Sequence, residues 1–400
     1  MKAVILAAGE GTRMRPLTSS RPKVMLPVAN KPIIEYILES AISAGIEQFV
    51  IVTGYCSQVI EDYFRDGKKW GASIEYVQQE KARGTAHAIE QAKGHVDARF
   101  IVLNGDMMVS SKHLRDLIKS DKDTVLSVKR VENPSDYGII NIDNNLVTEI
   151  VEKPEKPDSN LANAGIYLFD EKIFQYISMT PPSSRGEIEI TSTLEIMLNK
   201  GLEIGYRKIN ENWMDIGRPW DLLNANEIIL DHVKEQCHGT VEPNATLHGR
   251  VSIGKGTIIR NGAYIVGPVI IGENCDIGPN CYIRPHTAIG NRVRIGNAVE
   301  IKNSIVMDST NIGHLSYVGD SIIGTGCNFG AGTKVANLRH DGKNIKVTIK
   351  GQKIDSRRRK LGVIMGDNVH TAINTSINTG TIIASGQWTE PGEVVRFLKE

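Results

Sequence analysis

The 400-residue sequence is poor in cysteine, in net charge and in long apolar runs. Its five cysteines are too few and too scattered for a disulfide framework, and none has CxxC spacing, which favours a reducing compartment. Lysine and arginine number 47 against 46 acidic residues, so no global field points to nucleic acid or a membrane. No apolar run reaches the roughly 18 residues of a membrane span, and the N-terminal run is too short for a signal peptide. We therefore expect a cytoplasmic protein.

The C-terminal part contains a ladder of isoleucines six residues apart. A period of six fits neither a helix nor a simple strand, but it is typical of a parallel β-helix whose triangular coils use about one hexapeptide per side. The ladder slips by one residue near Ile312 and near Ile323, and it returns in phase at Met365. We predict that residues 240–400 form such a solenoid with one continuous core. The unbroken ladder comprises Ile253, Ile259, Ile265, Ile271, Ile277, Ile283, Ile289, Ile295 and Ile301.

The first 235 residues have a different pattern, in which short aliphatic strands alternate with amphipathic helices. This alternation predicts an α/β domain with a doubly wound, mostly parallel, Rossmann-like sheet whose ligands bind at the carboxyl ends of the strands. A helix at about 219–236 is the predicted connector to the β-helix. The predicted strands are 2–7, 48–53, 73–76, 100–104 and 124–129, with a helix at 33–44.

A glycine-rich segment, LAAGEGTRM at 6–14, follows the first predicted strand directly. Such a turn exposes backbone N–H groups that bind phosphate oxygens. The GxxxxGK[ST] pattern is absent, and Met14 replaces the third glycine of GxGxxG. The nearby cations Arg13, Arg15 and Lys23 suit a triphosphate. The alternative is a plain strand–turn–helix with surface charges.

The same segment, with RPLT and PKVMLPVANKP behind it, resembles the signature of sugar-1-phosphate nucleotidyltransferases. Further segments match that family in the same order: Gln79 with GTAHA at 84–88, NGD at 104–106, YG at 137–138, EKP at 152–154, NAG at 163–165 and WMDIG at 213–217. Each short motif is weak alone. Together they extend over about 210 residues, and the resemblance to the family is therefore specific.

The resemblance implies attack of a sugar-1-phosphate on the α-phosphorus of UTP or dTTP, with release of pyrophosphate. It implies Arg13 and Lys23 as catalytic residues, and Asp106 and Asp215 as ligands of Mg²⁺, which prefers one or two carboxylates plus substrate phosphates. The implied nucleotide-binding residues are Leu6, Ala8, Gly9, Gly11, Thr12, Gln79, Gly84 and Thr85. The implied sugar-binding residues are Gly138, Glu152, Lys153 and Asn163.

Residues 280–345 of the repeat resemble the acetyltransferase domain of the bifunctional enzymes that make UDP-N-acetylglucosamine, a left-handed β-helix. The resemblance rests on RP at 284–285, VEIKN at 299–303, GHLSYVGD at 313–320 and NFGAGT at 328–333. It implies acetyl-CoA as co-substrate and His314 as the base that deprotonates an amino sugar. An oxyanion donor near Tyr317 or near Ala331 stays open. The implied sugar-phosphate ligands are Arg284, Lys302, Tyr317, Asn328, Asn337, Lys343 and Lys346.

A basic segment at 338–360 interrupts the repeat, with nine Lys or Arg against two Asp. Ligand phosphates, including those of CoA, are the favoured partners, and we expect Ala331, Arg357 and Arg358 to bind acetyl-CoA. A solvated charge run is the plain alternative. A nucleic-acid surface is disfavoured because the segment has no aromatic residue for base stacking.

The motifs are mixed, since RPLT and WMDIG resemble the glucose-1-phosphate branch while GTAHA and the repeat resemble the N-acetylglucosamine branch. This mixture resembles archaeal bifunctional enzymes and implies broad specificity. The resemblance of the repeat to left-handed β-helix acyltransferases implies a homotrimer assembled through the β-helix, and we expect neither nucleic acid nor a membrane as a partner. Two alternatives remain. The chain could be a monofunctional nucleotidyltransferase with a structural β-helix, or a non-catalytic scaffold of the same architecture.

Overall fold

The computed structural model describes residues 1–397 and 399, and its contacts divide the chain into two compact units. The first unit consists of Met1–Glu10 and Ile33–Asp215. The second consists of Gly11–Pro32 and the chain from Ile216 onward. No helix among the described residues is long and apolar enough to span a membrane.

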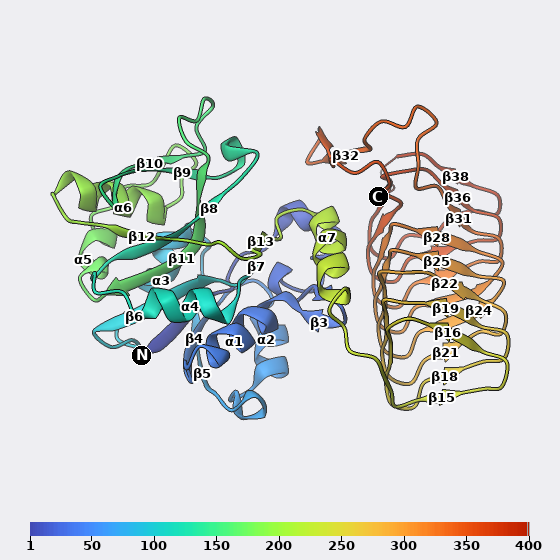
Figure 1. Ribbon diagram of the computed structural model, residues 1–400. Helices are drawn as coiled ribbons and strands as arrows, with labels where there is room; N and C mark the ends of the chain where they lie inside the picture. The colour runs from blue at the N-terminus through green and yellow to red at the C-terminus, as the bar shows by residue number, and fades with distance from the viewer. Residues whose placement is uncertain (398, 400) are drawn as a thin grey trace. The chain divides into compact units, whose positions relative to one another are not determined.

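A nine-stranded mixed sheet forms the centre of the first unit, in the order β5-β4-β1-β6-β11-β8-β12-β10-β9 (Figure 1). The expected parallel part is confirmed for β5, β4, β1 and β6, whose neighbours run parallel. β11 then pairs antiparallel with both β6 and β8. The strands are β1 (Lys2–Leu6), β4 (Gln48–Thr53), β5 (Ser73–Gln78), β6 (Arg99–Asn104), β8 (Val125–Arg130), β9 (Gly138–Asp143), β10 (Leu146–Glu152), β11 (Leu161–Asp170) and β12 (Gly205–Lys208).

Six helices accompany this sheet, and their apolar residues lie at helical spacing. In the first of them, Ile33, Ile34, Ile37, Leu38 and Ala41 are fully buried, as an amphipathic helix against a sheet requires. The helices are α1 (Ile33–Ser43), α2 (Ser57–Phe64), α3 (Thr85–Glu90), α4 (Ser111–Ile118), α5 (Ile173–Ile177) and α6 (Ile190–Asn199). A separate two-stranded sheet joins β7 (Met107–Met108) to β13 (Met214–Asp215).

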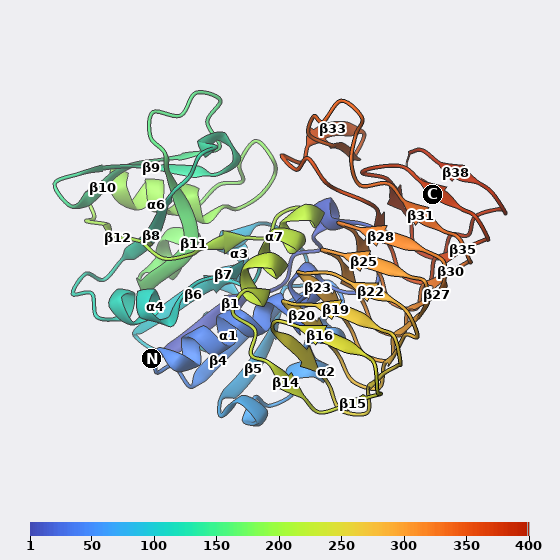
Figure 2. The same cartoon turned by 45° about the vertical axis from the view of Figure 1, so that its right-hand side comes forward.

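The second unit is dominated by a parallel β-helix, as the hexapeptide ladder predicts, and the helix is left-handed, as the resemblance to the acetyltransferase domain implies (Figures 1 and 2). Each coil gives one strand to each of three parallel sheets. The first sheet comprises β14 (Gln236–Cys237), β17 (Val251–Ile253), β20 (Val269–Ile271), β23 (Thr287–Ile289), β26 (Ile305–Val306), β29 (Ile322–Ile323), β34 (Ile364–Met365) and β37 (Ile382–Ile383). The second comprises β15 (Thr240–Val241), β18 (Ile258–Ile259), β21 (Asp276–Ile277), β24 (Arg294–Asn297), β27 (Asn311–His314), β30 (Asn328–Phe329) and β35 (His370–Thr371).

The third sheet can be followed in Figure 2 from β16 to β31. It comprises β16 (Thr246–His248), β19 (Tyr264–Val266), β22 (Tyr282–Ile283), β25 (Glu300–Lys302), β28 (Tyr317–Gly319), β31 (Lys334–Val335), β36 (Ser376–Ile377) and β38 (Val394–Val395). All nine isoleucines of the ladder are at most 1% exposed and belong to one continuous core. Cys275 and Cys281 are buried in the same core, which confirms them as packing residues, and burial raises the pKa of the Cys281 thiol to about 12.

The predicted slips of the ladder are real changes of coil length. Ile277 pairs with Ile295, but Ile295 pairs with Ile312, one residue earlier than the regular step. The later interruption adds a hairpin, β32 (Lys346–Ile349) and β33 (Gln352–Asp355), after which the coils resume with Ile323 opposite Met365. The sequence predicted the interruption but not the hairpin.

Two segments outside the repeat belong to the second unit. One is α7 (Pro219–Leu230), the connector helix that was predicted to extend to about 236. The helix ends earlier, because Gln236 is already part of β14, which pairs with β17. The other is Gly11–Pro32, with β2 (Pro27–Val28) and β3 (Lys31–Pro32). The Ala29 N–H donates to the Asn226 side chain of α7 at 2.9 Å, and the Asn30 amide donates to the Ile289 carbonyl at 2.5 Å.

Candidate functional site

The carboxyl ends of two central strands of the sheet lie next to each other. Leu6 ends β1 and Asn104 ends β6, and these residues are paired in the parallel register. The Gly105 N–H donates to the Leu6 carbonyl at 2.9 Å and so fixes the turn that carries Asp106. Ligands of open α/β sheets bind at this edge. Asp106 is therefore placed where the chemistry of such a fold occurs.

The short sheet of β7 and β13 brings the second predicted metal ligand to the same region. Asp215 is paired with Met107, the residue after Asp106, so the backbone segments that carry the two carboxylates lie close together. Two carboxylates plus substrate phosphates suit the octahedral shell of Mg²⁺. Among the described residues there is no group of three or more His, Cys, Asp or Glu that could hold a metal. The donor set therefore fits magnesium and does not fit a closed zinc site.

The glycine-rich segment is divided between the units. Leu6, Ala8 and Gly9 belong to the first unit, and the cation-bearing part that begins at Gly11 belongs to the second. Gly11 has a φ of 69°, and a Cβ there would lie 2.6 Å from the Lys23 Cβ, so only glycine fits this turn. The second unit thus packs the stem of Lys23 directly against the turn.

The segment expected to read the base is compact and already hydrogen-bonded. Gln79 is 5% exposed, and its amide nitrogen donates to the Gly84 carbonyl at 3.3 Å and lies 2.8 Å from Nδ1 of His87. Thr85 begins α3, and its hydroxyl accepts the Ile190 N–H at 3.0 Å. The structure therefore brings Gln79, Gly84 and Thr85 together, and their role in binding the nucleotide stays a prediction.

The predicted sugar-binding residues of the first unit also converge. A Cβ on Gly138 would lie 2.9 Å from Oε2 of Glu152 and 3.7 Å from the Asn163 Cβ. The Lys153 ammonium lies 3.6 Å from the same carboxylate. Arg185 donates to Glu152 at 3.0 Å, a contact that no sequence motif indicated. The result is a polar cluster from β9, β10 and β11 with both signs of charge.

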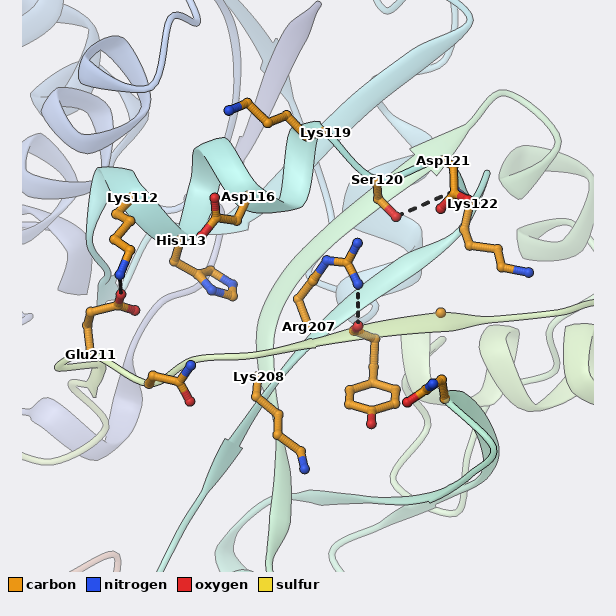
Figure 3. A pocket seen from close by; sticks show the side chains of 14 residues that line it. Lys112, His113, Asp116, Lys119, Ser120, Asp121, Lys122, Arg207, Lys208 and Glu211 are labelled. Carbon is orange, nitrogen blue, oxygen red and sulfur yellow. Dashed lines mark hydrogen bonds and ion pairs between the residues drawn. The ribbon is translucent and has the colours of Figure 1, made fainter.

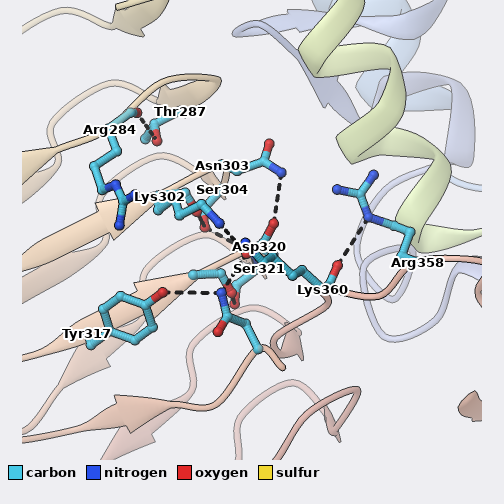
Figure 4. A network of polar contacts seen from close by, with 12 residues as sticks. Arg284, Thr287, Lys302, Asn303, Ser304, Tyr317, Asp320, Ser321, Arg358 and Lys360 are labelled. Atoms are coloured by element: carbon cyan, nitrogen blue, oxygen red, sulfur yellow. Dashed lines mark hydrogen bonds and ion pairs between the residues drawn. The ribbon is translucent and has the colours of Figure 1, made fainter. Parts of the chain in front are cut away.

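A second cluster lies on the third sheet of the β-helix (Figure 4). Successive coils place Arg284 after β22, Lys302 in β25 and Tyr317 in β28. Arg284 donates to Glu300 at 2.8 Å, and the Asn337 amide donates to the Tyr317 hydroxyl at 3.1 Å. Four of the seven sugar-phosphate ligands predicted for the β-helix, all but Asn328, Lys343 and Lys346, therefore lie on one face.

His314 lies at a corner of the β-helix, between the second and third sheets. It ends β27 and is exposed, and its carbonyl accepts the Gly332 N–H of the next coil at 3.4 Å. Ala331 precedes that glycine, so the turn that carries Ala331 stacks on the turn that carries His314. Asn328 lies on the second sheet, opposite Asn311. His314 and Asn328 are thus on elements other than the third-sheet cluster.

Some cations of the basic segment are exposed, whereas Arg358 forms an ion pair with α7. Lys343 and Lys346 are exposed in the hairpin region. Arg358 contacts α7 instead, where its guanidinium donates to Glu227 at 2.8 Å and to the Asn224 side chain. Arg357 is exposed beside it. Arg358 therefore makes a structural contact that no sequence motif indicated, and its role with acetyl-CoA stays a prediction.

A hollow of about 800 Å³ lies in the first unit, away from every predicted site residue (Figure 3). Lys112, His113 and Arg207 line it, and Lys112 pairs with Glu211 at 3.2 Å. Burial lowers the pKa of His113, whose Nε2 lies 2.8 Å from the Ser127 hydroxyl. No sequence motif indicated this hollow, because its residues come from α4, β12 and nearby turns that are far apart in sequence.

Comparisons with known proteins match both parts of the chain. A family model described as Nucleotidyl transferase matches residues 2–232, and one described as GMPPB C-terminal domain matches residues 265–391. The chain is 43% identical over 389 residues to the bifunctional protein GlmU of Methanocaldococcus jannaschii, covering 97% of this chain and 93% of that protein. It is 42% identical over 398 residues to a bifunctional sugar-1-phosphate nucleotidylyltransferase/acetyltransferase of Sulfurisphaera tokodaii, covering 99% and 97%.

The chain belongs to this bifunctional transferase family. It combines sugar-1-phosphate nucleotidyltransferase and acetyltransferase functions, and the predicted enzyme class is confirmed. A solved structure, a putative glucose-1-phosphate thymidylyltransferase from Bacillus anthracis in complex with a sucrose, is similar to the nucleotidyltransferase part. The TM-score is 0.53 and the identity 33%, covering 57% of this chain and 94% of that one.

Proposed function

We propose that the nucleotidyltransferase site joins a sugar-1-phosphate to UMP or dTMP, with release of pyrophosphate. Asp106 and Asp215 would hold Mg²⁺, which neutralises phosphate charge when it is bound. Arg13 and Lys23 stabilise the negative charge that spreads over the transferred phosphoryl group. The buried Gln79 beside Gly84 supports recognition of a pyrimidine base.

We further propose that the β-helix transfers acetyl from acetyl-CoA to the amine of glucosamine-1-phosphate. The observation that carries this proposal is the third-sheet cluster, in which Arg284, Lys302 and Tyr317 lie on successive coils with Asn337 bonded to Tyr317. His314, at the adjoining corner, takes the proton from the amine as it attacks the thioester carbonyl. The bond formed is C–N, the bond broken is C–S, and CoA leaves as the thiol.

Exposed apolar side chains support trimerisation through the β-helix beside His314. Leu315 and Ile373 are 60% and 54% exposed, and both lie on turns between the second and third sheets. Trp388 is 67% exposed and bridges to His370 at the end of the second sheet. Large apolar side chains along one edge favour a contact with another copy of the chain. A trimer would add residues of a neighbouring copy to the acetyl site.

The deciding experiment incubates the chain with glucosamine-1-phosphate and acetyl-CoA, without nucleotide, and weighs the sugar by mass spectrometry. We expect a gain of one acetyl group, with a rate that falls on the order of 10²-fold or more in His314→Ala. The matched control is His248→Ala, an exposed histidine on an earlier coil. Absence of acetylation by the parent chain would overturn this proposal and leave the β-helix structural.

A further inference from the structure

The third-sheet cluster is organised around a carboxylate to which the sequence analysis gave no role. Asp320 is 2% exposed. Its Oδ1 accepts from the Asn303 amide at 2.9 Å, and its Oδ2 accepts from the Asn337 amide at 2.6 Å (Figure 4). The Lys302 ammonium lies 3.3 Å from Oδ2. A buried carboxylate is tolerated only with such partners, so its position and theirs are fixed together.

The hydrogen bonds to Asp320 limit how many hydrogens Asn337 and Lys302 can donate to a ligand. Asn337 has two amide hydrogens, and one is directed to Asp320 while the other reaches the Tyr317 hydroxyl. Lys302 has three ammonium hydrogens and donates one of them to Asp320, so the other two remain for a ligand. Three proposed sugar-phosphate ligands are thus oriented, directly or through one bond, by a single buried acid.

A further cation, Lys360, lies beside Asp320. Lys360, at the end of the basic segment, lines an open cavity of about 770 Å³ together with Lys302, Asn303 and Asp320. The nearby Lys302 ammonium lowers the pKa of Lys360. Among the described residues no carboxylate lies within ion-pair distance of Lys360. Two ammonium groups are therefore held close together over one buried acid.

A third observation concerns the amide oxygen of Asn303, a residue that also lines this cavity. It is buried and has no hydrogen-bond partner among the described residues. Its amide nitrogen is already used, because it donates to both Asp320 and Glu227. A hydroxyl group brought in by a ligand, or a water molecule, would satisfy this acceptor.

We propose that Lys360 is a further ligand of the sugar phosphate and that Asp320 is the positioning residue that orients Lys302 toward it and, through Asn337, fixes the Tyr317 hydroxyl. A phosphate monoester is close to a dianion at neutral pH and has three acceptor oxygens, which suits two adjacent ammonium groups. The inference rests on the proposed acetyltransferase function. Lys360 contacts the phosphate, and Asp320 acts only through its neighbours.

The test compares glucosamine-1-phosphate with glucosamine as acetyl acceptors. Lys360→Gln is expected to raise the KM for glucosamine-1-phosphate about tenfold, with kcat unchanged and no effect on glucosamine, because one charge-assisted bond to phosphate is lost. The matched control is Lys353→Gln, an exposed lysine of the same segment. An unchanged KM in Lys360→Gln would overturn the role of this residue.

Asp320→Asn keeps the shape of the side chain but turns one acceptor oxygen into a donor. We expect kcat/KM for glucosamine-1-phosphate to fall about tenfold or more, while nucleotidyl transfer by the same molecules stays at the parent level. Equal losses with glucosamine and glucosamine-1-phosphate would make Asp320 a merely structural residue. If the parent chain acetylates neither acceptor, the proposed function fails. The inference then fails only if Lys360→Gln also leaves the calorimetric binding of glucosamine-1-phosphate unchanged.

Discussion

At the scale of single residues, the two proposed sites use separate side chains, so each activity can serve as an internal control for the other. Asp106 lies at the end of β6, and Asp215 lies opposite the next residue in the short sheet. Neither belongs to the β-helix. A substitution at Asp106 should therefore affect one reaction only.

We predict that Asp106→Asn lowers nucleotidyl transfer on the order of 10²-fold or more, because a neutral amide binds Mg²⁺ far more weakly than a carboxylate does. Pyrophosphate release from UTP and N-acetylglucosamine-1-phosphate is the measurement, and acetylation should stay at the parent rate. Asp97→Asn, at an exposed aspartate of the same unit, is the control. Loss of both activities would point to misfolding and contradict a ligand role.

Sequence motifs could nominate residues for these sites but not all of their partners. Lys302, Tyr317 and His314 stand in recognisable motifs, and their roles stay predictions. Asp320 stood in the same motif, but its role depends on Asn303 and Asn337 in neighbouring coils. Such contacts depend on how coils of unequal length stack, which local sequence does not encode.

At the scale of elements, regular repetition made the β-helix predictable, because each ladder isoleucine occupies the same environment. The limits of prediction appear where that regularity ends, as in the hairpin of β32 and β33 and in the early end of α7. In the first unit, the later strands β9 to β12 were missed. β9 and β10 form an antiparallel hairpin with each other, whereas β11 and β12 pair with strands that are far from them in sequence.

The contact between α4 and β8 leads to a prediction about how the stability of the fold depends on pH. His113 of α4 is 3% exposed and bonds to Ser127 of β8, and burial lowers its pKa below the usual value of about 6.5. The unfolded chain therefore takes up a proton at a higher pH than the folded chain. This contribution to stability is complete above about pH 6.5, and it is lost as the pH falls from there through the folded pKa.

We expect the free energy of unfolding of the parent chain to fall below about pH 6.5 more steeply than that of His113→Gln, by up to about 1.4 kcal/mol per pH unit. Urea unfolding at several pH values gives this slope. Ser127→Ala is the comparison, because it removes the hydrogen bond but leaves the imidazole buried, and it should keep the steep slope. Identical slopes for the parent chain and His113→Gln would refute the assignment.

At the scale of the whole molecule, one segment connects the two activities in an unexpected way. Gly11–Pro32 carries the proposed catalytic residues Arg13 and Lys23, yet its contacts place it with the β-helix. Arg21 of this segment pairs with Asp367 at 2.7 Å, and their side chains are 20% and 10% exposed. Ser20 donates to the same carboxylate at 2.5 Å.

We predict that Asp367→Asn weakens nucleotidyl transfer although the residue lies in the β-helix. Loss of the ion pair releases the segment, and ordering it again when the nucleotide binds costs free energy. The expected effect is a rise of about tenfold in the KM for UTP, equivalent to about 1.4 kcal/mol. Acetylation of glucosamine-1-phosphate should change less than about twofold, since no proposed acetyl-site residue contacts Asp367 among the described residues.

Asp276→Asn provides the matched comparison, because Asp276 pairs with Arg260 at 2.7 Å entirely within the β-helix. If tethering of the segment is the cause, this variant keeps the parent KM for UTP, and Arg21→Ala reproduces the effect of Asp367→Asn. If all three variants behave alike, the change reflects general destabilisation of the β-helix. The first result would mean that the β-helix serves both reactions: it carries the acetyl site and holds the segment that binds the triphosphate.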